Sequence, residues 1–168
     1  MADTAKVLVE MENGGAFTLE LYPEFAPETV ENFLNLVEEG FYDGIGFHRV
    51  VDGFMAQGGD PNGDGTGGSG QTIRGEFLQN GFALNSLSHK RGVISMARSM
   101  DPNSASSQFF ICYDDCSFLD GGYAAFGKVI EGMDTVDGFL DVERGYNSMG
   151  ELAVPKEPIL IRTMTVLD

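Results

Sequence analysis

Apolar and polar residues alternate in two runs near the start of the chain. The apolar positions are Val7, Val9 and Met11 in the first run, and Phe17, Leu19 and Leu21 in the second. The intervening residues, ENGG, are typical of a turn. The pattern therefore predicts a β-hairpin in which each strand turns one face toward a core.

A helical periodicity follows this hairpin. Pro27 suits the first turn of a helix, and Glu28 and Glu31 suit its positive end. Gly40 is a natural stop. Between these signals lies one apolar stripe with the spacing of a helix face, made of Val30, Phe33, Leu34 and Val37.

The rest of the chain consists mostly of short apolar runs bounded by Gly, Pro, Asp or Asn, which is typical of strands. The expected strands lie at residues 46–51, 54–59, 92–97, 107–112, 124–130 and 158–166. A second short helix is expected over residues 133–140. Many short strands with few helices predict a mainly β domain, and this pattern alone leaves a barrel and a sandwich open.

Length and charge narrow the class of protein. With 168 residues and no linker, the whole chain, 1–168, is expected to form a single domain. The net charge of −16 would repel phosphate backbones, so we expect no nucleic-acid partner. An acidic surface fits either ordinary solubility or adaptation to high salt. The sequence lacks a long apolar run and a secretory signal, so we expect no membrane association and a cytoplasmic location.

The glycine-rich run 58–70 reads as a surface loop that matches two well-known patterns incompletely. Residues 63–68 have the spacing of a dinucleotide fingerprint, but more glycine follows them instead of a helix. Residues 60–65 resemble the first half of a calcium-binding EF-hand loop, but Gln71 stands where a bidentate glutamate belongs. Calcium capture by this loop is therefore the weaker interpretation, and a polar loop the stronger.

Cysteine and histidine offer little conventional chemistry. Cys112 and Cys116 do not have redox spacing, and Cys112 is expected to be a small core residue. With only His48 and His89 beside them, a zinc cluster is not expected. The sequence also lacks the Gly-x-Ser-x-Gly elbow of many hydrolases. We therefore expect no metal and no cofactor.

Arginine and glutamine within apolar strands are more informative. Arg49 and Gln57 interrupt apolar runs close to Phe54 and Met55. If the two short strands pair, a guanidinium and an amide border an apolar patch. Because such groups are rarely buried without partners, they are candidates for chemistry.

Three segments together carry a family resemblance over essentially the whole chain. They are FHRVVDGFMAQGGDPNGDGTGG (47–68), SQFFIC (107–112) and LDGGYAAFGKV (119–129). In this order and spacing the chain resembles bacterial-type, single-domain cyclophilin peptidyl-prolyl cis-trans isomerases. The resemblance implies a closed eight-stranded antiparallel β-barrel capped by two α-helices. It also implies that the protein catalyses rotation about X-Pro bonds without a covalent intermediate, and that this activity assists protein folding.

The resemblance assigns Arg49 as the donor of a hydrogen bond to the prolyl nitrogen. Gln57 would hold the carbonyl that swings during rotation, and Gln108 would support the site by hydrogen bonding. Ala97 and the backbone at Arg98 would hold the peptide in an extended pose. The implied apolar pocket for the proline ring is formed by Phe54, Met55, Phe110 and Leu119, with Phe118 and Tyr123 lining the far wall.

Some positions depart from the better-known eukaryotic pattern. Phe118 stands where many members carry a tryptophan that contributes to cyclosporin binding, Tyr123 where many carry histidine, and Arg98 where many carry asparagine. We therefore expect cyclosporin to bind with reduced affinity. The expected partners are proline-containing peptides and folding proteins, and the expected state is a monomer. A binding module or chaperone with incidental isomerase activity is the alternative to an enzyme.

Overall fold

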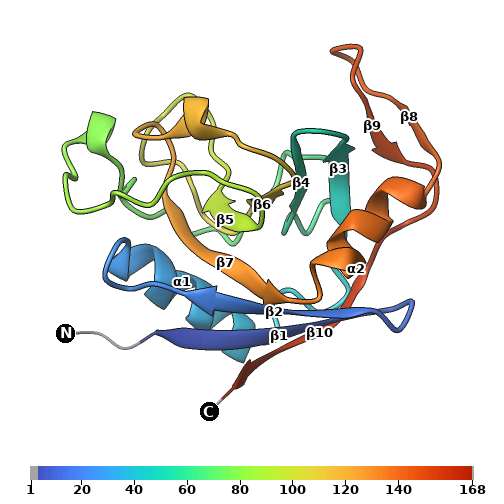
Figure 1. The fold of residues 1–168 in the computed structure, drawn as a ribbon, viewed down its shortest axis with the longest axis horizontal. Coiled ribbons are helices and arrows are strands. Elements are labelled where there is room, and N and C mark those ends of the chain that lie inside the picture. Colours follow the sequence, from blue (N-terminus) through green and yellow to red (C-terminus); the bar gives the residue numbers. More distant parts are fainter. Residues whose placement is uncertain (1–3, 168) are drawn as a thin grey trace.

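Eight antiparallel strands form one curled sheet in the computed structural model, which describes residues 4–167 (Figure 1). Their order across the sheet is β10-β1-β2-β7-β5-β6-β4-β3. The strands are β1 (Ala5–Met11), β2 (Ala16–Leu21), β3 (Phe47–Val51), β4 (Met55–Gly58), β5 (Val93–Met96), β6 (Phe109–Cys112), β7 (Ala125–Glu131) and β10 (Ile161–Leu167). The expected mainly β, antiparallel fold is therefore confirmed.

The two edges of the sheet meet at a short seam. An isolated bridge joins Gly46, just before β3, to Leu160, just before β10. A Cβ atom at Gly46 would lie 2.9 Å from the Ile159 carbonyl oxygen, so glycine permits this close approach. The eight strands of the expected barrel are therefore present. The expected closure is incomplete, because one bridge rather than a continuous ladder joins the two edges, and the sheet is a half-barrel.

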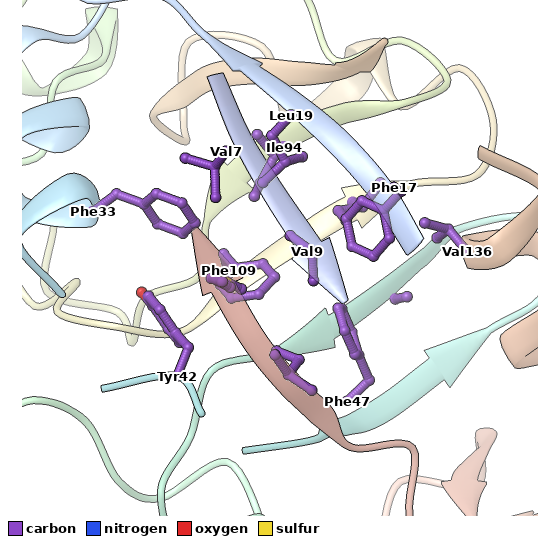
Figure 2. Packing of buried hydrophobic residues seen from close by; sticks show 14 of the residues in the cluster. Val7, Val9, Phe17, Leu19, Phe33, Tyr42, Phe47, Ile94, Phe109 and Val136 are labelled. Atoms are coloured by element: carbon purple, nitrogen blue, oxygen red, sulfur yellow. The ribbon is translucent and has the colours of Figure 1, made fainter. Parts of the chain in front are cut away.

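The hairpin expected from alternation is confirmed. In the register of β1 and β2, Val7 lies opposite Leu19 and Val9 opposite Phe17. These four side chains are at most 2 % exposed and point into the barrel (Figure 2). The alternation succeeds because one face of each strand is buried and a shift by one residue would expose it.

Helix α1 (Pro27–Glu38) packs against the sheet, and α2 (Met133–Asp137) continues into a 3₁₀ turn (Gly138–Asp141). The expected stripe of α1 is correct except for Leu34, which is only partly buried. Leu36, which the expected stripe did not include, is buried instead. That face consists of Thr29, Val30, Phe33, Leu36 and Val37.

A distant carboxylate caps the start of α1. Ala26, the N-cap residue, offers no side-chain hydrogen bond. Instead, buried Glu76 accepts hydrogen bonds from the Thr29 backbone N–H at 2.7 Å and from the Glu28 N–H at 3.2 Å. A negative charge at this end also complements the helix dipole. The segment around Glu76 thereby fixes α1 to the body of the protein.

Aromatic rings fill the middle of the barrel (Figure 2). Phe109 contacts Phe33, Tyr42 and Phe47 edge to face, with ring centroids 5.5–5.8 Å apart. All four side chains are at most 2 % exposed. Burial of each ring stabilises the fold by about 1.5–3 kcal/mol.

The sequence patterns do not predict one hairpin that the structure contains. Strands β8 (Arg144–Tyr146) and β9 (Leu152–Pro155) form a separate two-stranded sheet that projects from the barrel (Figure 1). Short 3₁₀ turns also occur at Leu78–Asn80 and Ser117–Leu119. Among residues 4–167, no helix is long and apolar enough to cross a membrane.

Candidate active site

The outer faces of three neighbouring strands form one row of side chains. Arg49 on β3 pairs with Gln57 on β4, and Gln57 pairs with Phe110 on β6. The pairing of the two short strands thus sets the guanidinium and the amide side by side, as expected from the sequence. Because strand residues alternate between faces, Val50, Ala56 and Phe109 point into the barrel instead.

This row borders a cavity of about 170 Å³ on the surface of the sheet. The cavity gathers side chains from β3, β4, β6 and the segments after β5 and before β7. Its lining consists of Arg49, Phe54, Met55, Gln57, Ala97, Arg98, Phe110, Leu119 and Tyr123. The structure therefore brings nine of the eleven residues expected from the sequence into one cavity.

The other two expected residues lie next to it. Gln108 lines an adjoining cavity of about 230 Å³, which shares Gln57, Ala97 and Arg98 with the first. Phe118 lies outside both cavities with 74 % of its surface exposed. Its ring lies 5.9 Å from that of Phe54, so it extends the apolar rim rather than the floor.

The floor of the cavity is apolar and firmly packed. Met55 and Phe110 are 1 % and 5 % exposed, and both pack in a small cluster with the two cysteines. Tyr123 meets the Phe110 ring edge to face, with centroids 5.8 Å apart. A ligand ring that enters here would leave water and contact carbon on most sides.

A chain of hydrogen bonds fixes the polar side of the cavity. Arg49 Nη1 donates to Gln57 Oε1 at 3.2 Å, and Gln57 Nε2 donates to Gln108 Oε1 at 2.9 Å. Gln108 Nε2 then donates to the carbonyl oxygens of Gly65 and Gly67. Because those carbonyls can only accept, they set the orientation of Gln108 and, through it, that of Gln57. The Gln57 oxygen must therefore face the guanidinium.

Sequence reasoning missed the partner at the other side of the guanidinium. Glu151 accepts from Arg49 Nε at 2.9 Å and from Nη2 at 2.8 Å, a bidentate pair. The hydrogen bonds from Arg49 hold the pKa of the Glu151 carboxyl below its usual value. The two residues lie 102 positions apart, and no periodicity or motif connects them.

Arg98, on the opposite wall, is also held in place. Its Nε and Nη2 donate to the Gly122 carbonyl, and its guanidinium lies over the Tyr123 and Phe77 rings at 4.6 and 4.9 Å. These contacts hold the Arg98 side chain in place on its own wall of the cavity. The Ala97 N–H donates to the Gln108 carbonyl at 3.0 Å, which ties this wall to β6.

The glycine-rich loop after β4 is organised by one buried carboxylate. Asp60 is 1 % exposed and accepts backbone hydrogen bonds from Asn62, Asp64 and Gly65. Burial acts to raise the pKa of Asp60, but these hydrogen bonds outweigh it and hold the pKa below its usual value. Both Asp60 oxygens therefore serve the loop itself, and the loop presents carbonyls to Gln108.

A polar network lies beneath the cavity floor. The His89 ring stacks under Phe110, with centroids 6.0 Å apart. Its Nδ1 is 2.8 Å from Asp120 Oδ1, and its Nε2 is 2.9 Å from Ser95 Oγ. Burial lowers the pKa of His89 although Asp120 opposes this, so the ring is neutral at pH 7, donates from Nδ1 and accepts from Ser95. Ser95 is completely buried, which denies a substrate access to its hydroxyl.

Cys112 and Cys116 complete this cluster as free thiols, both at most 1 % exposed. Burial raises the pKa of each thiol. The expectation that Cys112 is a small core residue is confirmed.

A larger cavity of about 310 Å³ lies at the seam of the barrel, between residues 44–48, 60–63 and 154–160. His48 borders it, and its buried Nδ1 has no hydrogen-bond partner among the described residues. We assign the functional site to the smaller cavity, because that one combines a held guanidinium, an oriented amide and an aromatic floor.

Comparisons with known proteins identify the family to which the chain belongs. Residues 6–166 match the family model described as "Cyclophilin type peptidyl-prolyl cis-trans isomerase/CLD". The chain is 45 % identical to a peptidyl-prolyl cis-trans isomerase of Helicobacter pylori over 139 residues, covering 82 % of this chain and 81 % of that protein. It is 46 % identical to peptidyl-prolyl cis-trans isomerase B of Bacillus subtilis over 124 residues, covering 74 % and 82 %.

Solved structures give the same result. A cyclophilin-type isomerase of Cryptosporidium parvum superposes with a TM-score of 0.83 at 30 % identity, covering 99 % of each chain. A structure of that protein in the presence of the dipeptide Ala-Pro superposes with a TM-score of 0.81 at 31 % identity, covering 97 % and 99 %.

Proposed function

The chain belongs to the cyclophilin-type peptidyl-prolyl cis-trans isomerases and is an enzyme of that class, and we propose that Arg49 is the group that lowers its rotational barrier. The uncatalysed barrier is about 18–20 kcal/mol, because rotation breaks amide resonance. Both isomers of an X-Pro bond are populated, since they differ by only about 0.5–1 kcal/mol. The enzyme therefore needs only to stabilise the twisted state.

The twisted state has a feature that the planar amide lacks. Its prolyl nitrogen becomes pyramidal and regains a lone pair, to which a guanidinium N–H can donate. This contact stabilises the transition state more than the ground state, which is the requirement for catalysis. A charge-assisted hydrogen bond contributes about 1.5–3 kcal/mol, or roughly 10- to 150-fold in rate.

The other cavity residues position the peptide in this proposal. Phe54, Met55, Phe110 and Leu119 enclose the proline ring, while Phe118 and Tyr123 extend the far wall. Gln57 holds the carbonyl that swings, and its side chain is already oriented by Gln108. Ala97 and the backbone of Arg98 hold the extended chain. The single observation that carries the proposal is the row Arg49–Gln57–Phe110, which sets a guanidinium at the rim of an apolar cavity.

The biological setting forms part of the same proposal. The enzyme acts as a cytoplasmic monomer on proline-containing segments of folding proteins. It binds cyclosporin with reduced affinity, because Phe118 stands in place of tryptophan and is mostly exposed.

The test is cis-trans exchange on an Ala-Pro-Phe peptide, measured by NMR with catalytic amounts of protein. Arg49→Ala and Arg49→Lys are expected to lower turnover at least about tenfold while peptide affinity changes less than about threefold. Arg162→Ala is the matched control, because Arg162 pairs with Glu10 on the β1–β10 side of the sheet. Equal losses of turnover and affinity in the Arg49 variants would favour a peptide-binding chaperone instead.

A further inference from the structure

We propose that Glu151 is a positioning residue for isomerisation, and that the turn between β8 and β9 therefore supports catalysis through Arg49. The inference rests on the proposed role of Arg49. It extends that role to a residue of a hairpin that lies outside the eight-stranded sheet.

The geometry of the ion pair fixes the plane of the guanidinium. Glu151 receives hydrogen bonds from Nε and Nη2 of Arg49, while Gln57 receives one from Nη1. One N–H on each terminal nitrogen stays free for a substrate. A guanidinium held on two edges can present these free N–H groups in only one plane, whereas an unpaired arginine samples many rotamers.

Glu151 is itself firmly placed by a compact turn. Asn147 Oδ1 accepts from the Glu151 backbone N–H at 3.0 Å, and Asn147 Nδ2 donates to Glu151 Oε1 at 2.8 Å. The Asn147 N–H donates to the Glu151 carbonyl at 2.9 Å. Asn147 thus holds both the backbone and the carboxylate of Glu151, so the carboxylate is oriented before any peptide binds.

The hairpin is also anchored next to Arg49. Arg144 on β8 donates from Nη1 to the carbonyls of Val50, the residue after Arg49, and of Leu152 on β9. The side chains of Arg49 and Glu151 are 29 % and 27 % exposed, so water screens their pair only in part. The hairpin therefore contacts β3 at two adjacent residues: Arg144 donates to the Val50 carbonyl, and Glu151 accepts from Arg49. These contacts hold the hairpin against β3.

Positioning makes a specific kinetic prediction. Removing the carboxylate leaves Arg49 charged but mobile, so the transition-state contact is made less often while the peptide is bound as before. Glu151→Gln is expected to lower kcat about five- to tenfold with KM changed less than about twofold. The Arg49 Nε–H signal is expected to be sharp and to exchange slowly in the native protein, where Glu151 accepts its hydrogen bond, and to exchange rapidly in Glu151→Gln.

A matched control lies on the same hairpin. Glu143 pairs with Lys156 at 3.2 Å, and both side chains are exposed. Glu143→Gln removes an ion pair of the hairpin without a contact to Arg49, and it is expected to leave kcat unchanged. Thermal unfolding of both variants shows whether the hairpin and barrel stay folded.

A double-variant comparison separates this inference from the proposed function. In an Arg49→Lys background the bidentate contact is lost, so adding Glu151→Gln is expected to have no further effect on kcat. If Arg49→Ala leaves turnover unchanged, the proposed role of Arg49 fails. If Arg49→Ala lowers turnover but Glu151→Gln leaves kcat unchanged or raises it, only the role of Glu151 fails. An equal loss of kcat in Glu143→Gln also overturns it.

Discussion

Strands β4 and β6 carry buried side chains on both faces, and the two faces lie in different environments. The inner face carries Ala56, Phe109 and Ile111 into the large barrel core, where aromatic and aliphatic side chains surround them. The outer face carries Met55, Phe110 and Cys112 into the small cluster under the cavity. Adjacent residues such as Phe109 and Phe110 are thus of the same type and similarly buried, but they belong to different environments.

The difference lies in what surrounds each face. The Phe109 ring meets three other aromatic rings of the barrel. The Phe110 ring instead lies between His89 and Tyr123 and borders an open cavity. The inner face therefore contributes to the closed barrel core, while part of the outer face stays open to the cavity. Substitutions on either face therefore measure how far the two faces are separable.

The largest effect is expected from truncating the inner ring. Phe109→Ala should lower the free energy of unfolding by about 3–5 kcal/mol, because it leaves a cavity among rigid rings. Phe110→Ala should lower it by less, because its site is open on one side, while peptide turnover falls more than about tenfold. Urea denaturation and peptide exchange measure the two effects. Equal losses of stability would show that the faces are one cooperative core.

Mild acid should lower the stability of the protein through His89, in the polar network under the outer face. Burial lowers the pKa of His89 below 6.5, so the folded protein disfavours the protonated form. The stability from this group is complete above about pH 6.5 and is lost as the pH falls toward the lowered pKa, by at most about 1.4 kcal/mol per pH unit.

The pKa of His48 is lowered as well, and burial is again the main cause. Denaturation curves at pH 7.5 and pH 5 measure how the free energy of unfolding changes with pH. Because His48→Gln removes the contribution of His48, this variant is the control that isolates the contribution of His89. An NMR titration of His89 with a midpoint at or above 6.5 would contradict the prediction.

The smallest effect on stability is expected at the exposed rim. Phe118→Trp should change the free energy of unfolding by less than about 0.5 kcal/mol, because the side chain is mostly in water. Cyclosporin should nevertheless inhibit this variant at lower concentration than the native enzyme. Inhibition assays with both proteins test it, and unchanged inhibition would show that the rim does not set this affinity.

The sequence predicts most of the regular elements for a physical reason. Alternation identified β1 and β2, and helical spacing identified α1, because each of these elements has a continuous buried face. Strand β10 is expected only from an apolar run, and its buried residues do not alternate. Choosing a barrel over a sandwich required the family resemblance. The same resemblance selected the cavity residues, since nothing in the letters of Phe109 and Phe110 tells which of them faces inward.

Other features depend on contacts that no local pattern encodes. Strands β8 and β9 are short and only partly buried, so they lack a clear apolar rhythm. Glu151 reaches Arg49, and Glu76 caps α1, across long stretches of chain. Such polar contacts involve only one or two residues from each segment, too few to produce a periodic pattern.

The pairing of β1 with β10 has a consequence during protein synthesis. Lys6 lies opposite Leu167, and Val9 opposite Met164, so nearly the first and nearly the last residues of this chain share one ladder. On the ribosome, β1 and β2 emerge long before β10, so the edge of β1 that does not pair with β2 stays unpaired in the meantime. Completion of the sheet must therefore wait until β10 has been synthesised. This member of a peptidyl-prolyl isomerase family thus completes its own sheet through a late and non-local folding step.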